Sequence, residues 1–307
     1  MRFLFIINPA AGAGRAGMRW KQVDHRLQRS DLKIAHVFTK APGEAALLSA
    51  KAAGEYEVIV AVGGDGTAAE VASGLVTSGS NGAALGILPF GTGNDLAEVL
   101  GIKSSEDALR CLAGGHTRQI DVLRVQCEVD GKETTRYALL FAGVGIISAA
   151  LRKTTPGLKR LLGQRLAYPA GLLRALAGFR SPRMIVLCDQ ERYSGEFLFA
   201  GASNTPIAGG GMKIAPSARI DDGVLDVNLI GALSPFRAIP MLRRVCRGLH
   251  LGQPVVRYFS SSRLEITSDT PLDVAADGEL IGQTPVRISV LPSALRVITP
   301  TGNPEAR

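Results

Sequence analysis

Two glycine-rich stretches in the first third of the chain have residue types that could bind an anion. Residues 63–67 read GGDGT, and residues 91–95 read GTGND. Glycines can adopt positive φ and let a phosphate group approach the main chain, because they carry no Cβ. Asp65 adds a carboxylate that could act on a metal ion or a hydroxyl group. The pattern predicts phosphate binding, although a tight strand-to-helix turn would explain either stretch without any function.

Both stretches follow apolar runs that predict buried strands of an α/β sheet. Residues 58–62 and 84–88 are short apolar segments, and residues 3–7 form a third. A helical segment follows each of them. Ligands bind at the carboxyl ends of strands in open α/β sheets, where the N-termini of the next helices also point. The two turns are therefore predicted to hold one nucleotide between them.

Three other stretches carry acids in a context that allows chemistry. Asp121 lies inside the apolar segment 120–125, where an unpaired carboxylate would be costly, so it is predicted to face a cleft. Residues 221–223 read DDG, and residues 277–279 read DGE. Asp-Gly is a strong hairpin signal, so either stretch could be an ordinary turn. A structural cation on Asp222 and neighbouring carbonyls is the alternative.

From about residue 125 onward the pattern changes to short strands separated by glycine, proline and charged turns. This pattern predicts a β-rich second domain, a sandwich or barrel, over residues 125–293, after an α/β domain of residues 1–124. Residues 158–179 are the exception, because arginines and lysines alternate there with leucines. They predict basic amphipathic helices that either pack against the sandwich or dock on an anionic bilayer.

The composition argues against several other classes of protein. A net charge of +8 and a pI near 9.6 favour an anionic partner, but aromatic residues are only 5% and do not interleave with basic ones as nucleic-acid platforms require. The four cysteines are too scattered for a zinc site or a disulfide framework and fit a reducing cytosol. No uncharged run reaches the ~18 residues of a membrane span. We therefore expect a cytoplasmic protein that does not bind nucleic acid.

Residues 12–17 match the Gly-x-Gly-x-x-Gly dinucleotide fingerprint in spacing only. Pro9 and the long gap after the first strand do not suit the tight turn of that fingerprint. The second predicted strand, residues 33–38, is followed by Thr39 and Lys40 rather than by an acid for a ribose hydroxyl. A nicotinamide dinucleotide cofactor is therefore not expected.

Together these stretches resemble the diacylglycerol kinase catalytic-domain family, in particular the soluble bacterial lipid kinases related to sphingosine and ceramide kinases. The resemblance rests on Asn8, Pro9 and the glycines after them, and then, in order, on residues 63–71, 91–95, 209–216, 221–223 and 277–279. It implies an α/β N-terminal nucleotide-binding domain of the NAD-kinase/diacylglycerol-kinase type and a β-sandwich C-terminal domain. It also implies that the final strand, near residues 294–298, returns to the first domain.

The resemblance implies transfer of the γ-phosphate of ATP to the hydroxyl of a lipid such as diacylglycerol, with Mg²⁺. The nucleotide-binding residues that it implies are Asn8, Pro9, Ala10, Ala11, Gly12, Thr39, Gly63, Gly64, Asp65, Gly66, Thr67, Glu70, Thr92 and Asn94. Glu279 or Asp277 would accept the hydroxyl proton, and Asp65 and Asp121 would help to hold catalytic magnesium. A structural magnesium would be bound by Asp222 with the main chains of Arg219 and Val224.

One departure and two alternatives accompany this interpretation. Leu140 stands where the family pattern leads us to expect an asparagine, which puts the lipid acceptor in question more than the reaction. An NAD kinase is the nearest alternative enzyme, but its Asn-Asn-Glu motif is not found after the first turn. A catalytically silent module that binds nucleotide or lipid headgroups is the alternative from another class. An insoluble substrate further implies peripheral membrane association through residues 158–179, and a homodimer stays open.

Overall fold

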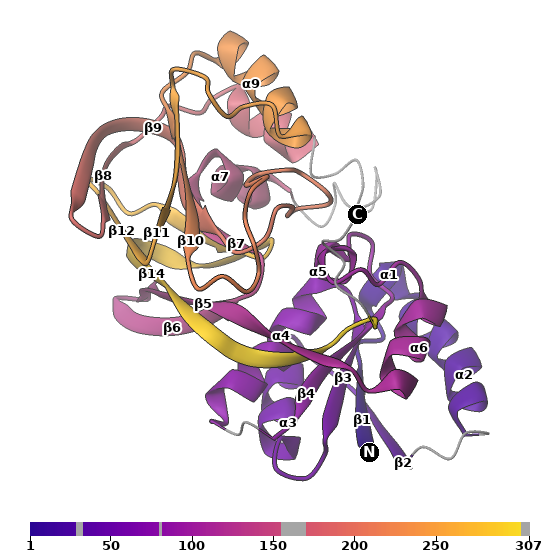
Figure 1. Cartoon of the computed structure of the whole chain (residues 1–307). Helices are drawn as coiled ribbons and strands as arrows, with labels where there is room; N and C mark the ends of the chain where they lie inside the picture. The colour runs from indigo at the N-terminus through magenta and orange to yellow at the C-terminus, as the bar shows by residue number, and fades with distance from the viewer. Residues whose placement is uncertain (29–32, 80–81, 155–169, 302–307) are drawn as a thin grey trace. The chain divides into compact units, whose positions relative to one another are not determined.

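The computed structural model describes residues 1–28, 33–79, 82–154 and 170–301, and the chain divides into two compact units (Figure 1). Unit 1 comprises Met1–Ile120 and Ser293–Arg307, and unit 2 comprises Asp121–Pro292. The domain boundary predicted from the sequence, at residues 124 and 125, lies within a few residues of this division. Among the described residues, no helix is long and apolar enough to cross a membrane.

Unit 1 is built on a parallel sheet. Its strands are β1 (Arg2–Ile7), β2 (Lys33–Phe38), β3 (Val58–Gly63), β4 (Ala84–Pro89) and the end of β14 (Glu279–Ile298), in the order β14-β4-β3-β1-β2. Every residue of β3 is buried, as expected for a central strand with both faces covered. Val297 pairs in parallel with Leu85, so the last strand lies in the sheet of unit 1.

Helices cover this sheet on both faces (Figure 1). They are α2 (Ala16–Leu27), α3 (Glu44–Ala52), α4 (Asp65–Thr77), α5 (Asp95–Val99) and α6 (Ser105–Gly114). The short turn α1 (Ala11–Gly14) has non-helical backbone at Gly12 and Ala13 and belongs to the loop before α2. Helix α2 buries Ala16, Trp20, Val23 and Leu27, a spacing that forms one helical stripe. Because α4 follows β3 and α5 follows β4, both predicted turns lie at the carboxyl end of a strand and open a helix.

Unit 2 is built mainly from antiparallel strand pairs. The strands are β5 (Thr117–Val129), β6 (Lys132–Ala138), β7 (Phe141–Gly145), β8 (Arg183–Cys188), β9 (Glu191–Ser203), β10 (Leu225–Gly231), β11 (Val256–Ser261), β12 (Arg263–Ser268), β13 (Asp273–Ala276) and most of β14. The pairings β14-β12-β8-β9-β7-β13-β14 form a closed ring, so the apolar sides of these strands enclose one core. The predicted fold class, an α/β domain followed by a β-sandwich domain, is confirmed.

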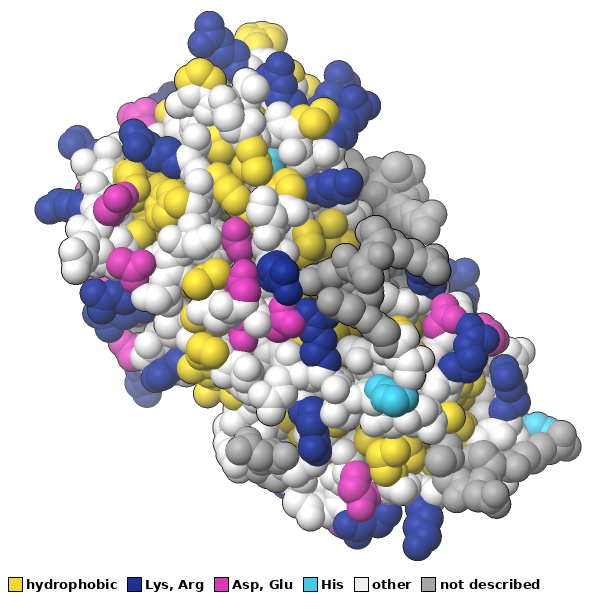
Figure 2. All heavy atoms as spheres, in the orientation of Figure 1, with side chains coloured by type: hydrophobic (Ala, Val, Ile, Leu, Met, Phe, Trp, Pro, Cys, Tyr) yellow, Lys and Arg dark blue, Asp and Glu magenta, His cyan; other side chains and the backbone are white. Residues whose placement is uncertain are grey.

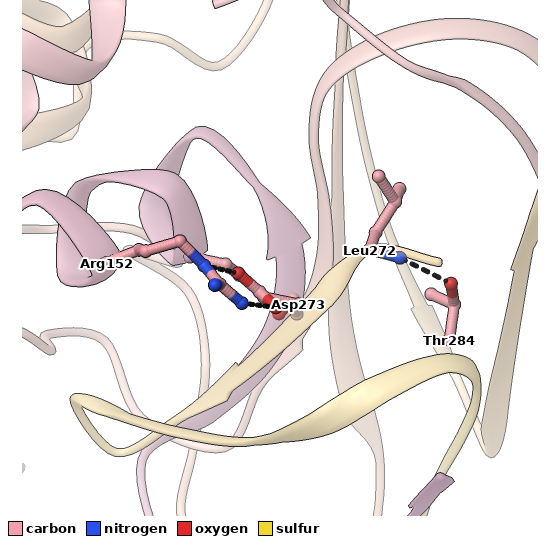
Figure 3. A network of polar contacts seen from close by, with 6 residues as sticks. Arg152, Leu272, Asp273 and Thr284 are labelled. Carbon is pink, nitrogen blue, oxygen red and sulfur yellow. Dashed lines mark hydrogen bonds and ion pairs between the residues drawn. The ribbon is translucent and has the colours of Figure 1, made fainter. Parts of the chain in front are cut away.

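Unit 2 also contains the helices α7 (Ile146–Lys153) and α9 (Pro235–Arg247). Arg152 at the end of α7 forms a bidentate ion pair with Asp273 on β13 (Figure 3). Beside it, the backbone N–H of Leu272 donates to the Thr284 hydroxyl at 2.9 Å. These bonds fix the start of the β13–β14 hairpin, whose turn carries the predicted DGE stretch.

Candidate functional site

In unit 1 the two predicted glycine turns are in direct backbone contact. The N–H groups of Phe90 and Gly91 both donate to the carbonyl oxygen of Gly63, at 2.7 and 2.9 Å. A Cβ on Gly91 would overlap the Cα of Gly64 and would lie 2.7 Å from the Asn94 amide oxygen. The turns therefore meet only because Gly64 and Gly91 carry no side chain.

A third loop, between β1 and α2, reaches the same place. Gly12, Ala13 and Gly14 all have positive φ, of 59°, 59° and 81°. A Cβ on Gly12 would overlap the carbonyl oxygen of Phe90. Three loops from three strand ends therefore converge, and we call residues 8–14, 63–67 and 90–94 the glycine cluster.

Two asparagines shape the glycine cluster through their side-chain amides. Asn8 accepts a hydrogen bond from Ala10 N at 3.0 Å and donates to the Thr67 hydroxyl at 3.2 Å. Asn94, which has a left-handed φ of 62°, accepts from Gly91 N at 2.9 Å and donates to Gly91 O at 3.1 Å. Asn8 and Thr67, predicted to share a site from positions far apart in the sequence, are thus brought together.

Asp65 lies where two helices begin. It is the first residue of α4, and its Oδ1 accepts a hydrogen bond from the N–H of Leu96, in the first turn of α5, at 3.0 Å. Helix N-termini carry partial positive charge, so a carboxylate there is stabilised. Asp65 therefore joins the two turns, and its half-buried side chain lies beside the glycine cluster.

Three other residues predicted to bind nucleotide differ in their contacts: Glu70, Thr39 and Thr92. Both oxygens of Glu70 accept backbone hydrogen bonds, from Gly43 at 2.9 Å and Ala45 at 3.1 Å, and so cap the start of α3. Thr39 donates its N–H to Ile7 O at 2.8 Å, directly after β2. Thr92 is exposed at the tip of its turn.

Arg15 and Arg19 also belong to this region, and no role was predicted for them from the sequence. Arg15 Nε donates to the carbonyl oxygen of Gly12 at 3.0 Å. The guanidinium of Arg19 lies 5.0 Å from the centroid of the Phe90 ring. Their spacing of four residues, on a helix that opens directly after a glycine loop, is the signal that could have identified them.

In unit 2 the acid Asp277 is bound by backbone amides. Its carboxylate accepts hydrogen bonds from Leu139 N at 2.6 Å, Leu140 N at 2.9 Å and Phe141 N at 3.1 Å. Asp277 itself has a positive φ of 46°. Glu279, two residues later at the start of β14, is exposed. The two acids of this turn therefore differ, because the bonds of Asp277 fix the backbone whereas Glu279 faces solvent.

Two of the three acids predicted to bind magnesium, Asp121 and Asp222, lie together in unit 2 around the Asp222-Gly223 turn. Asp121 is 1% exposed, and its Oδ2 accepts from Gly223 N at 2.6 Å. Its own N–H donates to the Ile220 carbonyl at 2.7 Å. Asp222 Oδ1 accepts from Val224 N at 3.2 Å. Asp121 thus lies with the proposed structural-metal residues, whereas Asp65, its predicted partner in catalytic magnesium binding, belongs to unit 1.

The donor chemistry of this turn fits a hard cation. Burial raises the pKa of Asp226, the hydrogen bond from the Tyr258 hydroxyl lowers it, and the negative charge of Asp222 raises it. Hard cations take carboxylate and carbonyl oxygens, which Asp121, Asp222 and the main chain of the turn could supply. In the described part of the chain, no group of three or more His, Cys, Asp or Glu side chains is arranged to bind a metal, so main-chain oxygens would have to complete the site.

Asn204 is a buried organiser of unit 2 for which no role was predicted from the sequence. It is 0% exposed, and its Nδ2 donates to the carbonyl oxygens of Asp121 at 2.9 Å and Leu139 at 3.1 Å. It therefore links the strand that carries Asp121 to the segment that Asp277 holds. An asparagine near the end of an apolar strand gives no sequence signal for such a role.

The predicted basic helices fall largely outside the described residues. Lys159, Arg160 and Arg165 lie in the part that is not described, whereas Arg174 is described and exposed. Leu173 beside it is 58% exposed. The membrane role expected for residues 158–179 stays a prediction.

Comparisons with known proteins find family matches in both parts of the chain. The sequence matches the diacylglycerol kinase catalytic domain over residues 2–125 and the YegS C-terminal NAD kinase beta sandwich-like domain over residues 140–299. A Pseudomonas aeruginosa protein named "Probable lipid kinase YegS-like" is 36% identical over 261 residues, which cover 82% of this chain and 80% of that protein. A Bacillus subtilis protein named diacylglycerol kinase is 28% identical over 303 residues, 97% and 96% of the two chains.

A solved structure of a diacylglycerol kinase from Bacillus anthracis has the same fold. It superposes with a TM-score of 0.77 at 23% identity and covers 100% of this chain and 98% of its own. The two family matches account for most of the sequence, one in each half, and the relatives match along most of their own length. The chain belongs to the family of diacylglycerol kinases and YegS-like lipid kinases.

Proposed function

We propose that the protein is an ATP-dependent lipid kinase that transfers the γ-phosphate to the hydroxyl of a lipid such as diacylglycerol. Membership of the kinase family supports phosphoryl transfer as the reaction. The observation that carries the proposal is the glycine cluster, where three main-chain loops meet at the carboxyl ends of parallel strands. Such a place suits the phosphates of a nucleotide.

The glycine cluster supplies what phosphoryl transfer mainly needs, which is positioning and neutralisation of charge. The N-termini of α4 and α5 contribute partial positive charge, and glycines at positions 12, 64 and 91 let the phosphates approach the main chain. Arg15, held at the Gly12 carbonyl, adds a full positive charge beside the first loop. Asn8 and Asn94 hold the loops in shape.

We assign the proton acceptor to Glu279. As the lipid oxygen bonds to the γ-phosphorus and ADP leaves, the hydroxyl proton must pass to a base. The carboxylate of Asp277 is engaged by three amides and holds the turn, which suits a positioning role. Glu279 is the exposed acid of the same turn.

Magnesium fits the proposal in two places. Asp65 would help to hold the catalytic ion, which would neutralise charge on the phosphates, and Asp121 and Asp222 would hold a structural ion at their turn. In each place the protein's own contribution is a carboxylate that the backbone already orients.

The test is phosphorylation by purified protein with labelled ATP and Mg²⁺, read by mass spectrometry against a lipid panel and NAD. We expect label on a lipid, and loss of at least about 100-fold in rate for Glu279→Gln, within the range of general-base effects. Glu128→Gln, which removes an exposed acid of β5, is the matched control and should retain activity. Label on NAD alone, or ATP binding without turnover, would refute the proposal.

A further inference from the structure

Helix α9 has an apolar side chain on its outer face that unit 2 does not cover. Its inner face buries Ala238, Met241 and Val245, at a spacing of one helical stripe. On the other side, Phe236 is 88% exposed, more than any other large hydrophobic side chain among the described residues. Ile239 is 38% exposed and Leu249, two residues beyond the helix, is 62% exposed. Exposure of this extent calls for a partner.

Helix α9 and the segments beside it in the sequence are basic and contain no acid. Between Asp226 and Glu265 the sequence has six arginines and no aspartate or glutamate, and four of these arginines are in α9. Arg243 and Arg247 lie seven and eleven residues after Phe236, which places all three on one side of a helix. Both arginines are exposed, and within the described residues neither forms an ion pair.

The space-filling view also shows apolar and basic side chains together in this region. Figure 2 shows dark-blue and yellow side chains side by side at the top of the view, where Figure 1 draws α9. Figure 2 shows magenta side chains mainly lower on the same face. The exposed end of unit 2 therefore combines apolar and cationic groups in one short helix.

We propose that α9 and Leu249 form a docking surface for an anionic lipid bilayer. Phe236 and Ile239 would enter the boundary between headgroups and acyl chains, and Arg243 and Arg247 would pair with lipid phosphates. Charge complementarity selects this partner, because a helix with four arginines and no acid does not complement a second copy of itself. One face of a 13-residue helix also offers far less than the roughly 800 Å² per partner of a stable protein interface.

This surface is distinct from residues 158–179, for which membrane docking is also predicted. It deepens the proposed function, because a lipid kinase must reach its acceptor at a bilayer. The docking is nevertheless measured without ATP, so the two proposals can fail separately.

The test is co-sedimentation with vesicles of phosphatidylcholine alone or of three parts phosphatidylcholine to one part phosphatidylglycerol. We expect binding only to the anionic vesicles, weakening as salt rises because screening shortens the reach of the arginines. Phe236→Ser, and Arg243→Ser with Arg247→Ser, should each weaken binding by about tenfold or more. Two control variants should bind as the wild type does. One is Leu47→Ser, at an exposed leucine of unit 1, and the other is Arg183→Ser with Arg192→Ser, at exposed arginines of β8 and β9.

The outcomes separate the alternatives. Wild-type vesicle binding by both α9 variants, with unchanged thermal unfolding, would overturn the proposal. A Phe236→Ser variant whose mass in light scattering falls from dimer to monomer, with vesicle binding intact, would overturn it in favour of a second copy. Vesicle binding that needs α9, together with no phosphorylation of any lipid, would support docking and reject the proposed function. If the α9 variants lose vesicle binding but phosphorylate a short-chain, water-soluble acceptor normally, the result would support both the docking surface and the proposed function.

Discussion

The glycine cluster of unit 1 and the acid-bearing turns of unit 2 are built in opposite ways. In the glycine cluster, main chain approaches main chain closely at Gly12, Gly64 and Gly91. In unit 2 buried or half-buried carboxylates, those of Asp121 and Asp277, bind backbone amides. A glycine in such a motif can therefore mark a close approach of two main chains, whereas an acid in one can be a structural ligand of the backbone.

The largest effect on stability is expected from Asp277→Ala. Removing the carboxylate leaves three amides without an acceptor, and each buried unsatisfied group costs about 1–3 kcal/mol, so we expect a loss of about 3 kcal/mol in the free energy of unfolding. Glu279→Ala, at the exposed acid of the same turn, should stay within about 0.5 kcal/mol of wild type. Urea unfolding measures both, and equal stabilities would remove the contrast between the two acids.

The next effect is expected from Gly91→Ala, which tests the unit 1 side of the comparison. The added Cβ would overlap Gly64 and push the two turns apart, at an overpacking cost of about 1–3 kcal/mol. We expect affinity for ATP, measured by calorimetry, to fall by about tenfold or more. Gly54→Ala, where an added Cβ meets nothing within 4 Å, is the control. Unchanged affinity in Gly91→Ala would show that contact between the turns is not needed for nucleotide binding.

Glu70→Ala tests an acid of unit 1 that backbone amides bind, as they bind the acids of unit 2. Loss of this cap on α3 should cost about 1 kcal/mol in the free energy of unfolding. Affinity for ATP should change little. Glu55→Ala, an exposed acid of unit 1, should leave both quantities unchanged. Weaker ATP binding with unaltered stability would instead support the nucleotide-binding role predicted from the sequence.

The smallest effect on stability is expected from lowering the pH, which titrates His250 in unit 2. This imidazole is fully buried, with Nε2 3.0 Å from both Asn228 Nδ2 and Ile214 O, and burial lowers its pKa. A lowered pKa in the folded state means that the unfolded chain takes up the proton first. Stability is therefore full above the ordinary histidine pKa of about 6.5 and falls as pH drops below it.

Thermal unfolding between pH 7.5 and 5.5 checks this expectation. His250→Gln should be less stable at pH 7.5 but should lose less stability on acidification than wild type. His116→Gln, at an exposed histidine, is the control and should keep the wild-type slope. An identical slope in all three proteins would exclude His250 as the titrating group.

Much of the fold could be predicted from the sequence, because local patterns of residues determine the strands and helices. Apolar runs of five residues before the glycine turns predicted the ends of β3 and β4 to within one residue, and the fold class followed from the change of pattern near residue 125. Which acids bind the backbone could not be predicted. The partners of Asp277 are 136 to 138 residues away, and Asn204 meets Asp121 across 83 residues. Contacts of that range depend on how strands pair, which short motifs do not encode.

The placement of β14 has a consequence for how the protein is made. β4 lies between β3 and the end of β14, whose Val297 pairs with Leu85. A ribosome releases that last strand only after the whole of unit 2 has emerged. Until then the nascent α/β unit has β4 as an unpaired edge, the kind of edge that invites pairing with other chains. The first unit to leave the ribosome is therefore the last to be completed, and the residues after Pro292 end its period of greatest risk of aggregation.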